Sequence, residues 1–303
     1  MKQEWKLFRK NGALFTLSLP GILYLFVIAY LPMAGIIVAF KDYRYDLGIF
    51  GSRWIGFKNF EFLFVSESAF VITRNTVLYN LGYMLIGTAA SLAVALLLNE
   101  IAGRLSRFYQ TVMFLPHFLS WVVVGYIAYA FLDAQSGFAN QALQALGLPP
   151  VDWYFDSRYW PYILNPVHLW KSIGFSALVY YAGILGIDPD YYEAARIDGA
   201  NRLQMALRIT LPMLLPLVSI LLIVSTGHMF RGDFGLHYFI PNNSGLLYGA
   251  TDVIDTYVYR ALRVIGDFGM SSAVGLYQSI VGLGLVLAAN YTVRKLNPDN
   301  SLW

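Results

Sequence analysis

The chain has 303 residues, of which 57% are hydrophobic, 17% aromatic and only 13% charged. Soluble domains carry about 25% charged residues, so lipid must cover part of this apolar surface. The net charge of +3 is spread along the chain, which excludes a basic block for nucleic acid, and the absence of cysteine excludes disulfides, thiolate metal sites and a cysteine nucleophile. The composition therefore indicates an integral membrane protein.

Six apolar segments have the length of about 20 helical residues that a bilayer core requires. We expect these spans at 13–39, 72–98, 109–132, 162–186, 212–230 and 271–292. The first contains Pro20 and Pro32 and is expected to kink or to start late. It follows basic residues as a signal peptide would, but its apolar run is too long and no small-x-small cleavage pattern closes it. An uncleaved first helix is therefore predicted.

The segment 54–64 lies in the first loop and is rich in aromatic residues. We expect it to form a short interfacial helix whose rings sit at headgroup depth. The loops 41–71, 133–161 and 231–270 would then share one side of the membrane.

Basic residues in short loops and at helix ends set the orientation of the spans. With six spans, one side receives Lys2, Lys6, Arg9, Lys10, Arg104, Arg107, Arg294 and Lys295. The long loops opposite hold the same number of basic residues, so the assignment depends on discounting long loops. We predict a cytoplasmic segment at 1–12, a transmembrane domain at 13–292 and a cytoplasmic tail at 293–303. The loop at 187–212 then also faces the cytoplasm.

This cytoplasmic loop is the most polar helix-forming stretch of the chain. Asp188-Pro189-Asp190 is a helix-start signal, and Gly199 is a favourable stop because glycine enters the left-handed conformation cheaply. Asn201 can cap a second helix that leads into the fifth span at Leu211-Pro212. The pattern predicts a helix, a sharp turn and a second helix.

Small residues and one acid mark the first of these helices. Ala194 and Ala195 would let a partner surface approach closely, and Glu193 could anchor it by charge. The alternative is an ordinary amphipathic connector in which Glu193 pairs with Arg196. The spacing resembles the EAA signature of binding-protein-dependent ABC importer permeases. That resemblance assigns ATPase coupling to Glu193, Ala194, Ala195, Gly199, Ile209, Leu211 and Pro212.

Other segments resemble one branch of carbohydrate permeases. Residues 31–43, 54–60, 115–125 and 301–303 are similar to the polysaccharide branch, which includes alginate-type and LplB-like permeases. The resemblance implies a type I importer permease fold with a coupling helix that docks into the ATPase. It also implies oligosaccharides as cargo, with acidic, alginate-like sugars as the narrower expectation.

No nucleotide or catalytic motif accompanies these features. The chain lacks the phosphate-binding sequence G-x-x-x-x-G-K-[ST] and a G-x-S-x-G elbow, and its histidines show no zinc-ligand spacing. We therefore expect no enzyme activity, no metal and no cofactor in this chain, with ATP and Mg bound by a separate ATPase. A membrane-embedded hydrolase is disfavoured because no nucleophile and base are recognisable.

Polar groups within spans usually face a cavity, because burial in lipid is costly, and sugars stack on aromatic rings. Interfacial belts and plain packing explain most such residues in any membrane protein. The candidates for a solute path are Asn80, Trp121, Tyr126, Trp170, Lys171, Tyr181, His228, Tyr277 and Gln278.

The sequence thus predicts an all-α, multi-pass permease subunit of an ATP-driven oligosaccharide importer in a bacterial cell membrane, with both termini cytoplasmic. It would work by alternating access. The expected partners are a second, non-identical permease subunit, two copies of an ABC ATPase and an extracytoplasmic solute-binding protein. The alternative is an ATPase-independent secondary transporter or channel, which is favoured only if the loop at 187–212 is a connector.

Overall fold

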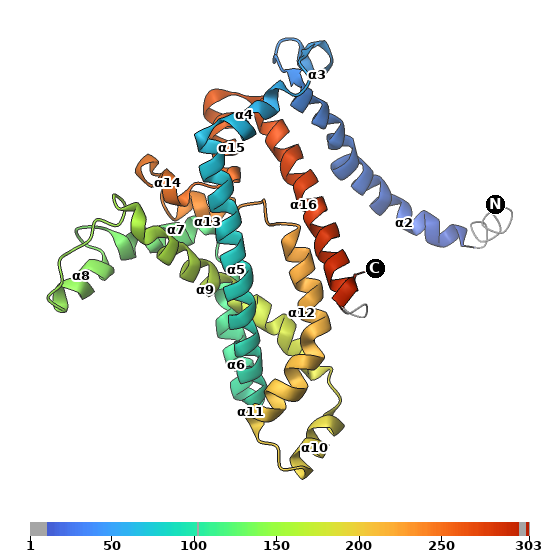
Figure 1. Ribbon diagram of the computed structural model, residues 1–303, viewed down its shortest axis with the longest axis vertical. Helices are drawn as coiled ribbons and strands as arrows, with labels where there is room; N and C mark the ends of the chain where they lie inside the picture. Colours follow the sequence, from blue (N-terminus) through green and yellow to red (C-terminus); the bar gives the residue numbers. More distant parts are fainter. Residues whose placement is uncertain (1–10, 102, 297–300, 303) are drawn as a thin grey trace. The chain divides into compact units, whose positions relative to one another are not determined.

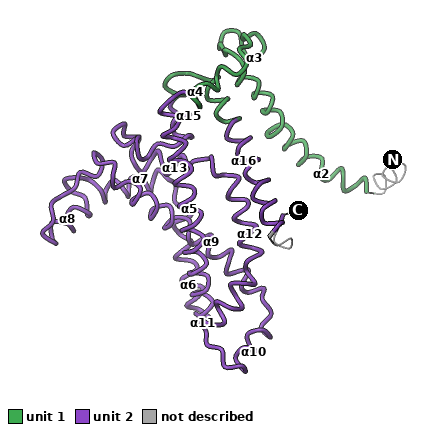
Figure 2. The backbone as a smooth tube through the Cα atoms, in the orientation of Figure 1, with its two compact units in different colours: residues 1–64, 261–276 green, residues 65–260, 277–303 purple. Residues whose placement is uncertain are grey.

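The computed structural model describes residues 11–101, 103–296, 301 and 302. The chain divides into two compact units, of which unit 1 comprises residues 1–64 and 261–276, and unit 2 comprises residues 65–260 and 277–303 (Figure 2). Most of the predicted cytoplasmic segment at 1–12 lies outside the described residues. Within the described part, the only strands are β1 (Lys41–Asp42) and β2 (Arg53–Trp54), so the all-α prediction is confirmed.

Unit 1 contains the first predicted span, which changes its helical geometry along its length. The α-helix α2 (Gly12–Leu25) passes into the π-helical η1 (Phe26–Tyr30) and then into the 3₁₀ segment η2 (Leu31–Phe40). The change falls just before Pro32, which has no N–H and whose ring clashes with the carbonyl four residues earlier. The expected disturbance of this helix is therefore found at Pro32, whereas Pro20 is accommodated inside α2.

The prediction of a helix over 54–64 is wrong in its first half. Trp54 belongs to β2 and pairs with Lys41 of β1, and Gly56 has φ +63°. The indole of Trp54 also stacks on Phe40 with ring centroids 5.7 Å apart. Helical structure begins only at η3 (Lys58–Phe60) and continues through α4 (Glu61–Val65).

The other elements follow in chain order. They are α3 (Gly48–Gly51), α5 (Glu67–Glu100), α6 (Gly103–Phe114), η4 (Leu115–Phe118), α7 (Trp121–Leu132), α8 (Phe138–Ala145), η5 (Ser157–Tyr159), α9 (Trp160–Leu185), α10 (Pro189–Ile197), α11 (Arg202–Met205), η6 (Ala206–Thr210), α12 (Leu211–Thr226), α13 (Phe234–Phe239), η7 (Gly245–Leu247), α14 (Tyr248–Thr251), α15 (Ile254–Arg260), η8 (Ala261–Ile265) and α16 (Phe268–Leu296).

Each of the six predicted spans coincides with a helix or a bent pair of helices. Four helical runs are long and apolar enough to cross a membrane, at 12–40, 67–100, 202–226 and 268–295. A fifth span would be the pair 103–118 and 121–132, which is bent by 96°. The remaining prediction, 162–186, corresponds to α9, which has 26 residues. Because α9 carries polar residues such as Asn165, His168 and Lys171, it is not among the helices apolar enough to cross a membrane by composition.

Unit 2 is organised around α5 and α9, which pack against each other (Figure 1). At one end of this unit lie α10 and α11, and at the other end lie α13, α14 and α15 (Figure 1). Glycine permits the closest helix contact, because a Cβ at Gly174 of α9 would lie 1.9 Å from the carbonyl oxygen of Met113 in α6. A buried cluster near the α13 end includes Trp160, Leu236 and Leu247.

Candidate functional site

The helix α10 is built by sequence signals at both of its ends. The Asp188 carboxylate accepts a hydrogen bond from the backbone N–H of Asp190 at 3.0 Å, and Pro189 occupies the first turn. At the other end Gly199 has φ +78°, and the N–H of Ala200 donates to the carbonyl of Ala195 at 2.9 Å. This is the six-to-one bond of a Schellman motif. The predicted first helix and its sharp turn are confirmed.

The second helix of the loop begins with a capping box. The side chain of Asn201 accepts from the backbone N–H of Gln204, whose side chain accepts from the N–H of Asn201. The π-helical η6 then continues α11 into α12, with Pro212 in the first turn of α12. The loop thus joins the fifth span without a break in the helical run.

Helix α10 leaves its surface uncovered. None of the nine described residues of α10 is buried, and Ile197 and Tyr191 are 86% and 54% exposed. Glu193 and Ala194 are exposed as well, and Ala195 is half-buried. An apolar side chain as exposed as Ile197, beside small residues and an acid, fits a surface that a partner protein covers.

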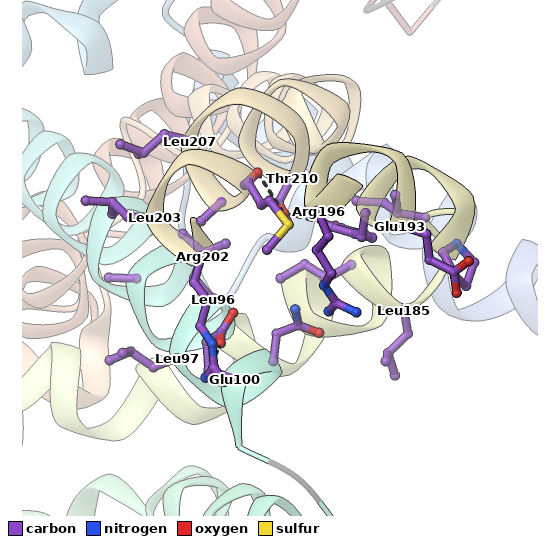
Figure 3. Close-up of a pocket in the computed structure, with 18 residues that line it drawn as sticks. Leu96, Leu97, Glu100, Leu185, Glu193, Arg196, Arg202, Leu203, Leu207 and Thr210 are labelled. Atoms are coloured by element: carbon purple, nitrogen blue, oxygen red, sulfur yellow. Dashed lines mark hydrogen bonds and ion pairs between the residues drawn. The ribbon is translucent and has the colours of Figure 1, made fainter. Parts of the chain in front are cut away.

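A cavity of about 990 Å³ lies between α10 and the helix ends that surround it. Its walls come from the ends of α5 and α9 and from α10, α11 and η6 (Figure 3). Across this space the guanidinium of Arg202 pairs with the carboxylate of Glu100 at 2.9 Å. The hydroxyls of Tyr192 and Thr210 lie 2.9 Å apart and join α10 to η6. Around the cavity, α11 is thus tied to the end of α5 by an ion pair, and α10 is tied to η6 by a hydrogen bond.

A second cavity, of about 330 Å³, lies between α5, α9 and α12. The rings of Tyr83 and His168 stack in it with centroids 3.9 Å apart, and Ser172 and Ser176 add hydroxyls. Of the described residues that line it, none is Lys, Arg, Asp or Glu. Its size is that of a small-ligand site, and hydroxyls beside flat rings suit a sugar.

A known family model covers the loop at 187–212 and the spans that flank it. Residues 87–298 match the model of the family described as "Binding-protein-dependent transport system inner membrane component". The chain belongs to this family. It is a multi-pass membrane permease, and the predicted family and type I importer fold are confirmed.

Relatives of this permease include two proteins of Bacillus subtilis (strain 168). It is 35% identical over 289 residues to the polygalacturonan/rhamnogalacturonan transport system permease protein YteP, covering 94% of this chain and 89% of YteP. It is 34% identical over 292 residues to Protein LplB, covering 96% of this chain and 91% of LplB. The similarity therefore extends over almost the whole chain.

Two solved structures are also similar to this chain over almost its whole length. One is a bacterial ABC transporter involved in the import of the acidic polysaccharide alginate, with a TM-score of 0.88, 32% identity and coverage of 97% of this chain and 99% of that one. Another is a bacterial alginate ABC transporter in complex with an alginate pentasaccharide-bound periplasmic protein, with a TM-score of 0.87, 32% identity and coverage of 96% and 97%. The permease thus shares its fold with carbohydrate importers.

The structure distributes the predicted solute-path residues of the permease over several environments. Asn80 and His228 line the 330 Å³ cavity. Lys171 lies over the ring of Trp121 at 5.0 Å and donates to the carbonyl of His117 at 2.9 Å. Of the other candidates, Tyr126 is 74% and Trp170 45% exposed, Tyr181 packs against a buried cluster, and Tyr277 is edge-on to Phe230.

Gln278 has a bracing position in the permease. Its amide nitrogen donates to the carbonyl of Phe230 at 2.6 Å and to the carboxylate of Asp255 at 3.1 Å. Burial raises the pKa of Asp255, while the N–H of Gly232 and the Gln278 amide act in the opposite direction. These contacts tie α16 to α15 and to the turn that follows α12.

Most residues of the 330 Å³ cavity are not among the predicted solute-path residues. The signal was a polar stripe of His168, Ser172 and Ser176 at intervals of four residues along the predicted span 162–186. On the span 72–98 the members Asn80, Tyr83 and Thr88 lie on the facing side of α5. This stripe is recognised only when polar residues are considered by their helical spacing and not one by one.

The permease holds its α13–α14 end together with buried hydrogen bonds. From α5, the amide nitrogen of Asn75 donates to the carbonyls of Gly249 and Asp252 at 3.2 and 3.0 Å. Nδ1 of His237 lies 2.8 Å from the carbonyl of Thr251, and its Nε2 lies 3.2 Å from the hydroxyl of Tyr83. Burial lowers the pKa of His237 to about 4. A neutral imidazole that donates from Nδ1 and accepts at Nε2 satisfies both contacts.

Proposed function

We propose that this permease is the subunit through which an ATP-driven importer moves acidic oligosaccharides into the cytoplasm of a bacterium by alternating access. The observation that carries the proposal is α10, a helix capped at both ends, uncovered on its outer surface and bearing the EAA residues. In this proposal an ATPase docks on α10 at Glu193, Ala194 and Ala195. Gly199 shapes its turn, and Ile209, Leu211 and Pro212 join it to the span.

The partners follow from the single coupling helix in the described residues. One α10 addresses one ATPase, so two ATPase copies require a second permease subunit, which we propose to be non-identical. ATP and Mg would be held by the ATPase, because this chain has no G-x-x-x-x-G-K-[ST] sequence. We place both termini and α10 in the cytoplasm, and the α13–α14 end on the side where a solute-binding protein delivers sugar.

The acidic cargo is supported by two independent similarities. Alginate is an acidic polysaccharide, and polygalacturonan is a polymer of a uronic acid; their importers match this chain over almost its whole length. We place the 330 Å³ cavity on the solute route. Because the described residues that line it carry no fixed charge, the choice of an acidic sugar would be made by the binding protein rather than in this cavity.

Reconstitution of the whole transporter tests the proposal. Proteoliposomes with both permeases, the ATPase and the binding protein should take up a uronate oligosaccharide only with ATP, and a neutral oligosaccharide of equal length poorly. Glu193→Lys should abolish uptake and uncouple it from ATP hydrolysis, whereas Glu67→Lys, the same change on an exposed residue of α5, should not. Uptake without the ATPase would indicate a secondary transporter or channel instead, and unchanged uptake in Glu193→Lys would remove the coupling role.

A separate pair of variants tests the solute route. Ser176→Leu places a bulky side chain in the 330 Å³ cavity and should block uptake while ATPase stimulation by the binding protein persists. Ala182→Leu makes a similar addition at an exposed position of the same helix and should leave uptake intact. Normal uptake in Ser176→Leu would exclude this cavity from the route.

A further inference from the structure

Helix α10 has little to hold it to the membrane-spanning helices. None of its nine described residues is buried, and the 990 Å³ cavity separates it from the end of α5. Among the described residues, the bond between the hydroxyls of Tyr192 and Thr210 is the one side-chain hydrogen bond that joins α10 to a candidate span. Other attachment comes from the chain connections at 186–188 and 198–201.

Thr210, the partner of Tyr192 in this hydrogen bond, lies in a π-helical turn of the span. Thr210 is 2% exposed and is the last residue of the π-helical η6. Its hydroxyl lies 3.5 Å from the carbonyl oxygen of Met205, to which it can donate, so its lone pairs can accept from Tyr192. A π-helical turn has a wider hydrogen-bond ring than an α-helix, and such turns occur frequently at functional sites.

We propose that the Tyr192–Thr210 hydrogen bond is the link that makes α12 follow α10. Tyr192 and Thr210 are positioning residues, because neither is placed here in contact with sugar or nucleotide. The π-helical turn at 206–210 would be the point where a displacement of α10 enters the span. This inference rests on the proposed coupling role of α10.

The chain offers matched variants for this hydrogen bond. Tyr192→Phe removes only the hydroxyl, Thr210→Val removes its partner at nearly constant volume, and Thr210→Ser retains a hydroxyl. Tyr162→Phe is the control, because it removes the same hydroxyl from an exposed tyrosine in the first turn of α9, outside the docking helix. The complete transporter in proteoliposomes provides two readouts, which are sugar uptake and ATP hydrolysis stimulated by the sugar-loaded binding protein.

The link predicts a change in the number of ATP molecules hydrolysed per sugar transported. Tyr192→Phe and Thr210→Val should each raise this ratio about five-fold, the factor that corresponds to about 1 kcal/mol for one hydrogen bond. Thr210→Ser and Tyr162→Phe should stay near the wild-type ratio. The double variant Tyr192→Phe/Thr210→Val should be no worse than either single change, since both remove the same interaction. A loss of folding alone would lower both activities together and leave the ratio unchanged.

Two results would overturn the link. One is a wild-type ratio in Tyr192→Phe, and the other is an equal rise in Tyr162→Phe. Glu193→Lys, measured in parallel, separates this failure from failure of the proposed function. If Glu193→Lys uncouples the transporter and Tyr192→Phe does not, only the link is wrong. If neither variant changes the ratio, the coupling role of α10 is wrong as well.

Discussion

The loop backbone at the α13–α14 end of unit 2 is held by buried side chains of α5 and α13, whereas the backbone of α10 at the opposite end is held mainly by its own caps. At the first end, Asn75 is 5% and His237 3% exposed, and both satisfy loop carbonyl groups. At the second end, α10 contributes no buried residue among those described. Elements with few buried contacts open or shift at lower free-energy cost than buried ones.

This difference fits the two tasks proposed for the ends. A surface that receives a loaded binding protein benefits from being preorganised, because little ordering entropy is then lost on association. A helix that transmits motion must instead move relative to the spans at modest cost. Unit 2 thus has one end held by buried hydrogen bonds and one end with few buried contacts. Substitutions at the first end should lower stability, and substitutions at the second should lower coupling.

The largest contrast is expected between two glycines with the same backbone conformation. Gly199 has φ +78° in the coupling loop and Gly147 has φ +73° after α8, and a Cβ at either would meet no atom within 4 Å. Alanine at either position costs about 1–2 kcal/mol of backbone strain. Gly199→Ala should lower sugar uptake at least ten-fold at equal expression because it reorients α10, whereas Gly147→Ala should leave uptake within two-fold. Equal uptake in both variants would show that the turn at Gly199 has no special role.

A change at the rigid end should act on stability instead of coupling. Asn75→Ala leaves the buried carbonyl of Asp252 without its amide donor, which should destabilise the protein by about 1–3 kcal/mol. The melting temperature in detergent should fall by several degrees, while the ATP hydrolysed per sugar stays at the wild-type value. Asn99→Ala, at an exposed position of the same helix, should not change the melting temperature. An increase in the ATP hydrolysed per sugar in Asn75→Ala would contradict the assignment of stability to one end and coupling to the other.

A smaller, pH-dependent effect is expected from His237. Its folded-state pKa of about 4 lies below the ordinary value near 6.5, because burial disfavours the charged ring. The stabilisation is therefore complete above about pH 6.5 and is lost as the pH falls toward 4. Melting temperatures measured from pH 8 to 5 should decline, and His237→Asn should start lower but decline less. His228→Asn, at an exposed histidine, should keep the wild-type decline in melting temperature. If His228→Asn removed that decline, the pH dependence would not come from His237.

Local signals explain why so much of α10 could be predicted from the sequence. Asp188, Pro189, Gly199 and Asn201 act on backbone within three residues of themselves, and each occupies the role that its chemistry predicts. The prediction of a helix over 54–64 was wrong because contacts beyond the segment decide its structure. Its outcome depends on the pairing of Trp54 with Lys41 and on the left-handed Gly56, which a count of aromatic residues does not include.

The 330 Å³ cavity was harder to predict because three helices line it together. Asn80 and His228 were found because each is a polar group in or near an apolar span. Lys171 and Trp121 proved to contact each other, a pairing that their sequence separation does not indicate. Gln278 was selected by the same reasoning, but it braces α16 against Asp255. Polarity within a span therefore marks a constrained residue without distinguishing a solute contact from a structural one.

The central claim is that an ATPase docks on α10, and site-specific cross-linking tests it most directly. Because the native chain has no cysteine, Ala194→Cys introduces a single thiol in this subunit. A thiol-reactive photo-cross-linker at this position, in the assembled transporter, should give an adduct of this chain with the ATPase subunit. Ser136→Cys, in the exposed loop before α8, should give none. Absence of the Ala194 adduct, or an equal adduct from Ser136, would contradict the account.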